Sequence, residues 1–184
     1  MTSTAARARL FGHIRARAFR QGEAFQLASG RTSTIYFDMK RILFEPEAIA
    51  LVAELVLEKL DAEPVDLIGG MAVGAVPLVA AVSQKSWPER PLPGFFVRKT
   101  VKDHGTRNTI EGLAPDVLKG RTVVMLEDVS TTGGSVMLAV QAARRAGAIV
   151  NTVLTLVDRQ EGAVENLAAE GLTLVSLYRA DEFV

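Results

Sequence analysis

A strand pattern followed at once by a glycine-rich turn and a helix is the feature that most constrains the fold of this chain. Residues 121–126 end in four consecutive apolar residues, residues 130–134 are rich in hydroxyl groups and glycine, and helical spacing then runs to about Ala146. A strand that is apolar on both faces must be covered on both faces, which is typical of parallel sheets between layers of helices. The segment therefore predicts one unit of a layered α/β fold.

The rest of the chain repeats this alternation of short apolar runs and helical spacing. We expect strands at residues 65–68, 94–97, 149–157 and 172–177, and helices at about 4–19, 46–60, from 75, and 164–169. Two further short strands are expected within residues 25–39, around a Ser29-Gly30 turn. The fold class is therefore α/β, with a central, mostly parallel sheet flanked by helices. The length of 184 residues favours a single domain over residues 1–184.

The composition excludes several classes of protein. Basic and acidic residues balance at 21 each, so a broad nucleic-acid-binding face is not expected. The chain has no cysteine, which excludes disulfides and thiolate zinc sites. No apolar stretch has the ~20 residues that a membrane span needs. The arginine-rich start lacks the apolar core of a secretory signal and suits an amphipathic helix better than a transit peptide, so we expect a cytoplasmic protein.

The acidic and hydroxyl-rich residues after the central strand predict a site for a sugar phosphate. Glycines let the backbone approach an anion closely, and free N–H groups at a helix start point at it. Two adjacent carboxylates would repel that anion, but they suit the vicinal hydroxyls of a ribose, which can donate hydrogen bonds to them. The alternative is an ordinary helix start with a Ser or Thr cap. The predicted site comprises Glu127, Asp128, Val129, Ser130, Thr131, Thr132, Gly133, Gly134 and Ser135.

A cluster of cations precedes this unit. Arg98, Lys99, Lys102 and Arg107 lie within ten positions, with His104 among them. Like charges this close are unfavourable unless an anion meets them, and a diphosphate leaving group is such an anion. The alternative is a solvated charged loop.

Arg159 follows the strand expected at residues 149–157, in the sequence Asp-Arg-Gln-Glu-Gly. A guanidinium can bind a planar carboxylate through two parallel hydrogen bonds. The alternative is a local salt bridge with Asp158 or Glu161.

These motifs, in this order, resemble those of the type I phosphoribosyltransferases, and the Arg-Lys-x-x-Lys-x-His-Gly loop and the Asp-Arg-Gln-Glu-Gly segment resemble the orotate phosphoribosyltransferases among them. The resemblance spans nearly the whole chain and implies a small N-terminal hood formed mainly by residues 1–40. It implies transfer of the phosphoribosyl group of phosphoribosyl diphosphate (PRPP) to orotate, with Mg²⁺ held mainly by substrate oxygens and water. It also implies a homodimer in which loop 98–107 reaches the partner's site.

The resemblance assigns roles residue by residue. It implies PRPP contacts by Arg98, Lys99, Lys102, His104 and residues 127–135, with Lys102, His104 and Asp128 as catalytic residues. It implies orotate contacts by Thr131 and Arg159. Tyr36 and Phe37 are expected either to pack against the pyrimidine or to lie in the core.

Two positions depart from the family pattern. Many relatives carry a lysine at the position of Ala28 and another within the loop at residues 69–77, and this chain has neither. Lys40 is a hypothetical substitute. Because these lysines are missing, a non-catalytic regulator that senses PRPP or nucleotides is an alternative interpretation. A transferase for a purine base is a further alternative.

Overall fold

The structure, a computed structural model, describes residues 2–26, 32–61, 63–99 and 109–184. Its centre is a parallel sheet of four strands in the order β3-β6-β7-β8. These strands are β3 (Leu67–Gly70), β6 (Thr122–Ser130), β7 (Ile149–Asp158) and β8 (Thr173–Arg179). The predicted parallel α/β sheet is confirmed.

The sheet continues beyond β3 through isolated parallel bridges to the next strand segment, between Ile68 and Gly94 and between Met71 and Val97. This segment ends in β4 (Phe96–Val97), which pairs antiparallel with β5 (Ile110–Glu111). The cationic loop therefore departs from and returns to a short two-stranded ribbon at the margin of the sheet.

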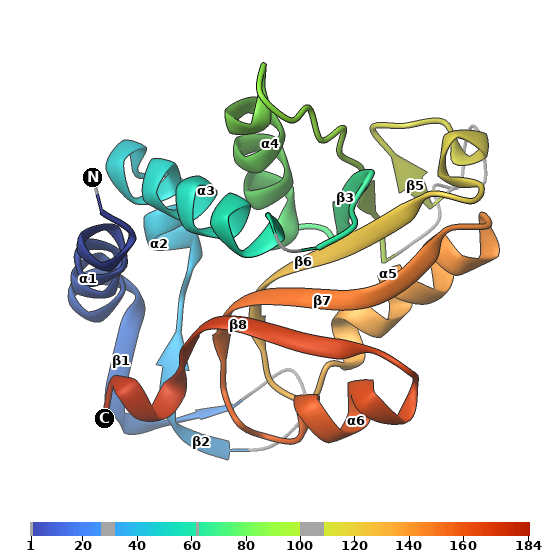
Figure 1. Cartoon of the computed structure of the whole chain (residues 1–184). Coiled ribbons are helices and arrows are strands. Elements are labelled where there is room, and N and C mark those ends of the chain that lie inside the picture. Colours follow the sequence, from blue (N-terminus) through green and yellow to red (C-terminus); the bar gives the residue numbers. More distant parts are fainter. Residues whose placement is uncertain (1, 27–31, 62, 100–108) are drawn as a thin grey trace.

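Helices cover both faces of the sheet (Figure 1). On one face lie α3 (Pro46–Leu60) and α4 (Ala75–Ser86), and on the other lie α5 (Gly134–Arg145) and α6 (Ala163–Ala169). The side chains of β6 alternate between two hydrophobic clusters: Val124 and Leu126 join the α3 and α4 side, and Val123 and Met125 join the α5 side. This is why the strand is apolar on both faces.

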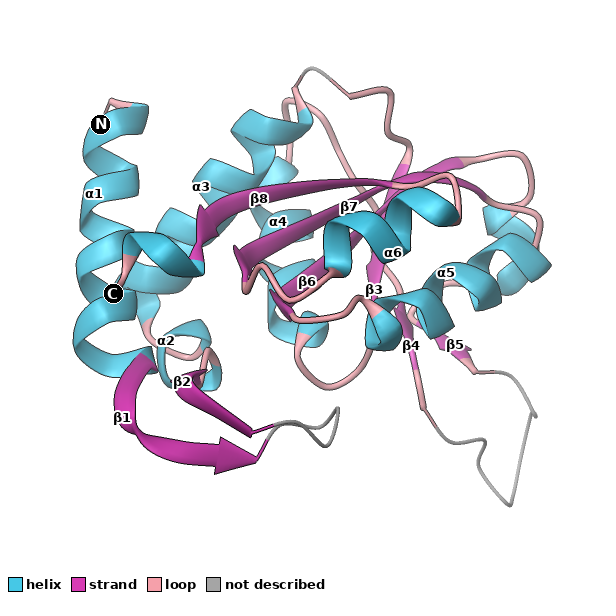
Figure 2. Ribbon diagram, turned by 90° about the horizontal axis from the view of Figure 1, so that it is seen from below, coloured by secondary structure: helices cyan, strands magenta, loops and turns pink. Residues whose placement is uncertain are grey.

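The N-terminal part forms a smaller structure beside the carboxyl ends of β6, β7 and β8 (Figure 2). It consists of α1 (Ser3–His13), a π-helical turn (Ile14–Ala18), the antiparallel pair β1 (Phe19–Gln26) and β2 (Thr32–Phe37), and α2 (Lys40–Leu43). We refer to residues 3–43 as the hood.

An aromatic cluster joins the hood to the C-terminus. Phe183 is 1% exposed; its ring stacks on that of Phe11 at 4.5 Å between centroids and meets that of Phe37 edge-on at 5.3 Å. The hydroxyl of Tyr178 donates a hydrogen bond of 2.6 Å to the backbone oxygen of Arg7. The hood is therefore anchored by burial of aromatic area rather than by a linker alone.

Most predicted elements are confirmed, and several boundaries are wrong. The helix expected at residues 46–60 has those bounds, whereas the opening helix ends as a π-helical turn and β1 begins at Phe19 rather than near Phe25. The central strand extends four residues beyond Leu126, so the acidic pair lies within it. The sequence pattern did not predict α2, β5 or the 3-10 turns at Pro115–Leu118 and Ala180–Glu182. Within the described residues, no helix combines the length and apolarity needed to cross a membrane.

Candidate functional site

The acidic pair lies at the end of β6, where the strand passes from the core to a cavity. Glu127 is 7% exposed, and its Oε2 atom has no hydrogen-bond partner among the described residues. Burial raises the pKa of Glu127 to about 8 and also raises the pKa of Asp128 above its ordinary value. Two carboxylates held this far from water are unfavourable for folding, and hydrogen-bond donors from a ligand would relieve that cost.

A cavity of about 280 Å³ adjoins this pair. It is bounded by the acidic pair, by Ser135 of α5, by residues 71–75 between β3 and α4, and by Lys40 of the hood. A methyl group built on Gly74 would lie 2.5 Å from Oδ1 of Asp128, which is far inside van der Waals contact. The absence of a side chain at position 74 therefore leaves the room that Asp128 occupies.

The turn after β6 leads directly into α5, as the sequence predicts. Gly133 has φ +78°, a left-handed conformation that favours glycine, and a Cβ there would also meet Leu167 at 3.0 Å. The side chain of Asn166 donates a hydrogen bond of 2.9 Å to the backbone oxygen of Thr132, which fixes the turn from the neighbouring helix. The first N–H groups of a 12-residue helix are thus presented beside the acidic pair.

Arg159 lies next to this turn, because its backbone N–H donates a hydrogen bond of 2.9 Å to the carbonyl of Ser130. Its side chain is only 2% exposed. The Nη2 atom lies 2.6 Å from Oε1 of Glu161 and donates a hydrogen bond of 2.7 Å to Oγ of Ser33 in the hood. The buried Nε atom has no partner in the described part of the chain. The salt bridge with Glu161 is the alternative that the sequence left open, yet it does not satisfy the guanidinium.

Lys40 places a cation at the mouth of the cavity. Its Nζ atom lies 2.8 Å from Oδ1 of Asp38, and this interaction raises the pKa of Lys40 and lowers the pKa of Asp38. The negative charge of Asp128 also raises the pKa of Lys40, whose side chain is 61% exposed. The amine is therefore charged and accessible to a bound anion.

The other predicted residues are distributed as follows. Phe37 is 5% exposed within the aromatic cluster, the core position that the sequence left as an alternative to pyrimidine contact, while Tyr36 is half-buried. Arg98 lies 3.6 Å from Glu111, and Lys99 is exposed. Val129, Thr131 and Thr132 are half-buried, Ser130 is buried, and Gly134 and Ser135 are exposed. Lys102, His104, Arg107 and Ala28 lie outside the described residues.

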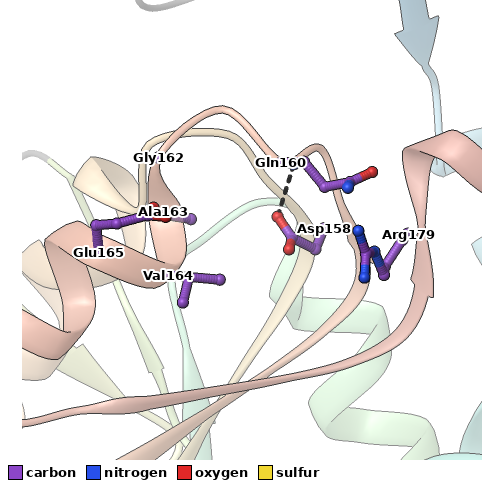
Figure 3. A pocket seen from close by; sticks show the side chains of 7 residues that line it. All are labelled: Asp158, Gln160, Gly162, Ala163, Val164, Glu165 and Arg179. Carbon is purple, nitrogen blue, oxygen red and sulfur yellow. Dashed lines mark hydrogen bonds between the residues drawn. The ribbon is translucent and has the colours of Figure 1, made fainter.

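A second cavity of about 450 Å³ lies beside the loop that carries Arg159 (Figure 3). It is lined by Asp158, Gln160, Arg179 and the start of α6. Figure 3 shows Asp158 accepting a hydrogen bond from the backbone of Gln160, at 2.8 Å. This bond shapes the loop, and Arg159 is not among the residues lining this cavity.

The carboxylate oxygens at the cavity suit a metal ion that is bound chiefly through a substrate. Among the described residues, no group of three or more Asp, Glu, His or Cys side chains is placed to hold a metal ion. The acidic pair supplies carboxylate oxygens at the cavity, which suits Mg²⁺ coordinated mainly by substrate oxygens and water.

The sequence pattern did not predict Ser33 as a partner of Arg159. The two residues are 126 positions apart, and nothing in the local pattern around either indicates the contact.

Comparison with known proteins places these features in a wider group. Residues 38–176 match the family described as phosphoribosyl transferase domain. The chain is 50% identical over 186 aligned residues to the orotate phosphoribosyltransferase of Rhodopseudomonas palustris strain BisB18, covering 100% of this chain and 99% of that protein.

Solved structures agree. The orotate phosphoribosyltransferase of Mycobacterium tuberculosis H37Rv in complex with Fe(III) dicitrate has a TM-score of 0.82 and 35% identity, covering 97% of this chain and 98% of that chain. The same enzyme in complex with 5-phospho-alpha-D-ribosyl 1-diphosphate has a TM-score of 0.79 and 33% identity, with the same coverage.

Proposed function

The chain belongs to the phosphoribosyltransferase family, among the orotate phosphoribosyltransferases, and we propose from this premise how its own residues carry out the reaction. The enzyme transfers the 5-phosphoribosyl group of PRPP to orotate and releases pyrophosphate, a step of pyrimidine biosynthesis leading to UMP. One observation carries the assignment of the base: a buried guanidinium with an unsatisfied Nε lies beside the phosphate turn.

The ribose phosphate occupies the turn between β6 and α5. Residues 129–135 surround the 5-phosphate with backbone N–H groups and hydroxyls, while Glu127 and Asp128 accept hydrogen bonds from the ribose hydroxyls. The cavity beside the acidic pair receives the diphosphate, and the backbone of residues 71–75 lines it. Lys40 approaches that group from the hood.

Orotate binds beside the turn, with its carboxylate on Arg159 and with Thr131 next to the ring. A purine base has no carboxylate to offer this guanidinium, so Arg159 favours orotate. A ring nitrogen of orotate, in its deprotonated anionic form, attacks the anomeric carbon, the new C–N bond forms as the bond from that carbon to the diphosphate oxygen breaks, and pyrophosphate leaves. Holding both reactants in line contributes much of the rate.

The cationic loop completes the site. Arg98, Lys99, Lys102 and His104 stabilise the negative charge that grows on the departing pyrophosphate, and His104 can donate a proton to it. The acidic pair would lie beside Mg²⁺ bound with PRPP, and that ion would supply Lewis-acid stabilisation and a template.

We propose that the working unit is a two-fold symmetric homodimer in the cytoplasm, in which loop 98–107 serves the partner's site. Two exposed apolar side chains support an interface: Val73, which lines the cavity from the β3–α4 loop, is 73% exposed, and Phe44, directly after α2, is 75% exposed.

The test is an absorbance assay of orotate consumption with PRPP and Mg²⁺. The wild-type enzyme is expected to consume orotate and to leave hypoxanthine, guanine, adenine and xanthine unchanged. Lys102→Ala should lose more than tenfold in turnover, meaning more than ~1.4 kcal/mol of barrier, whereas Lys59→Ala on α3 should not. Binding of PRPP with no release of pyrophosphate would favour a non-catalytic regulator over an enzyme. Turnover of a purine base would overturn the assignment of orotate as the substrate.

A further inference from the structure

The Arg159 guanidinium is held from two sides by groups that belong to different parts of the fold. Glu161 is a neighbour on the same loop, at 2.6 Å, while Ser33 belongs to strand β2 of the hood, at 2.7 Å from the same Nη2 atom. Because the side chain is only 2% exposed, each of these contacts restricts where the guanidinium can lie.

Ser33 is itself fixed by its strand. Its Oγ atom accepts a hydrogen bond of 3.2 Å from the backbone N–H of Ile35 as well as the bond from Arg159. A hydroxyl oxygen has two acceptor positions, so both are taken and the hydroxyl proton is the remaining hydrogen-bonding function of Ser33. The serine therefore acts as a rigid acceptor for Arg159 and still has one donor left.

These contacts leave one donor of Arg159, the Nε atom, without a partner among the described residues. Nε is buried and has no partner in the described residues, which is unfavourable for a charged group in the absence of a ligand. An arginine fork binds a carboxylate through two N–H groups in a fixed plane, so the orientation of that plane decides whether both bonds can form.

We infer that Ser33 is a positioning residue for orotate recognition: it fixes the orientation of the Arg159 guanidinium that the substrate carboxylate is to meet, and it thereby couples the hood to base specificity. This inference rests on the proposed function. It deepens that function by assigning part of the preference for a carboxylated pyrimidine to the hood, 126 residues away from Arg159 in the chain.

The chain offers a matched control. Thr34 is the next residue of β2, is exposed, and points to the opposite side of the strand because side chains alternate. Thr34→Ala removes a hydroxyl from the same strand without touching Arg159. Ser33→Thr keeps a hydroxyl at position 33 and should restore most of what Ser33→Ala loses.

The experiment measures kcat and KM for orotate, for PRPP and for uracil, the pyrimidine that lacks the carboxylate. For Ser33→Ala, we expect kcat/KM for orotate to fall about 10- to 150-fold, the range for losing one hydrogen bond to a charged group, with KM for PRPP unchanged. The preference for orotate over uracil should fall by the same factor, and Thr34→Ala should match the wild type.

A general weakening of the fold would lower the use of both bases together and would leave their ratio unchanged, which would overturn the inference. An unaltered KM for orotate in Ser33→Ala would overturn it as well. If the wild-type enzyme itself fails to consume orotate, the proposed function fails and not merely the role of Ser33, so the two failures are distinguishable.

Discussion

Replacing Lys40 with alanine tests whether this chain uses a hood lysine at its PRPP site. Lys40 lines the cavity beside Glu127 and Asp128, and its Nζ atom is 2.8 Å from Asp38. A hydrogen bond to a charged group contributes ~1.5–3 kcal/mol when it is sheltered from water. The lysine side chain is 61% exposed and already forms an ion pair with Asp38, so we reduce the expected contribution to PRPP binding to about 1–2 kcal/mol.

This free energy corresponds to a fall of about 5- to 30-fold in kcat/KM for PRPP, with KM for orotate little changed. The cost in folding stability should stay below about 1 kcal/mol, because exposed ion pairs contribute little. Steady-state kinetics with PRPP as the varied substrate measure the first quantity, and urea denaturation measures the second. Lys40→Arg keeps the charge and should recover part of the loss.

Arg41→Ala is the control for the removal of a positive charge. Arg41 follows Lys40 in α2 and also contacts Asp38, at 3.3 Å, but it lies in a different surface depression together with Arg17 and Arg20. Its loss should leave kcat/KM for PRPP within about twofold of the wild type. If Lys40→Ala is as active as Arg41→Ala, the lysine has no role at the site and the reasoning is refuted.

Two further predictions concern the free energy of unfolding. Glu127 has a pKa of about 8 in the folded protein and about 4.5 when unfolded, so the native state binds more protons between these values and the free energy of unfolding falls as pH rises. Relative to the wild type, Glu127→Gln should therefore gain up to about 5 kcal/mol of stability between pH 5 and pH 8. If urea denaturation shows the same difference between the two proteins across that range, the burial of this carboxyl is contradicted. Phe183→Ala should lower the free energy of unfolding by about 3–5 kcal/mol and Tm by about 6–20 °C in calorimetry. The control Val184→Ala changes a side chain that is 67% exposed and should melt close to the wild type. Equal melting temperatures for the two variants would contradict the anchoring of the hood by the aromatic cluster.

Local chemistry explains which parts of the fold could be predicted from the sequence. Helix α3 has the expected bounds because Pro46 suits the first turn and the side chain of Glu45 accepts a hydrogen bond of 2.8 Å from the backbone of Ala48. The extent of β6 was underestimated because its last residues are polar. Backbone pairing with β7 continues through them to Ser130, since ladder hydrogen bonds do not depend on side-chain polarity.

Contacts between separate segments of the chain explain why the start of β1 and the role of Ser33 were not predicted. Strand β1 contains Gly22 and charged residues and lacks a clear alternation, and it is a strand because it pairs with β2. At the site, residues 127–135 and Arg159 were predicted from residue types that carry their chemistry on their own. Ser33 was not, because a serine becomes a partner of Arg159 only through the position of the hood.

The acidic pair shows how the cost of folding and the binding of substrate are linked. The fold buries Glu127, leaves its Oε2 atom without a partner in the described residues, and keeps position 74 free of a side chain so that Asp128 fits against the loop. The Oε2 atom does not stabilise the protein by itself, since a buried carboxyl oxygen without a donor is unfavourable. Ribose hydroxyls are donors of the kind that Oε2 of Glu127 lacks, so PRPP bound as proposed would remove this penalty. Because a ligand that binds only the folded state also stabilises that state, substrate binding would offset the instability that its site imposes on the protein.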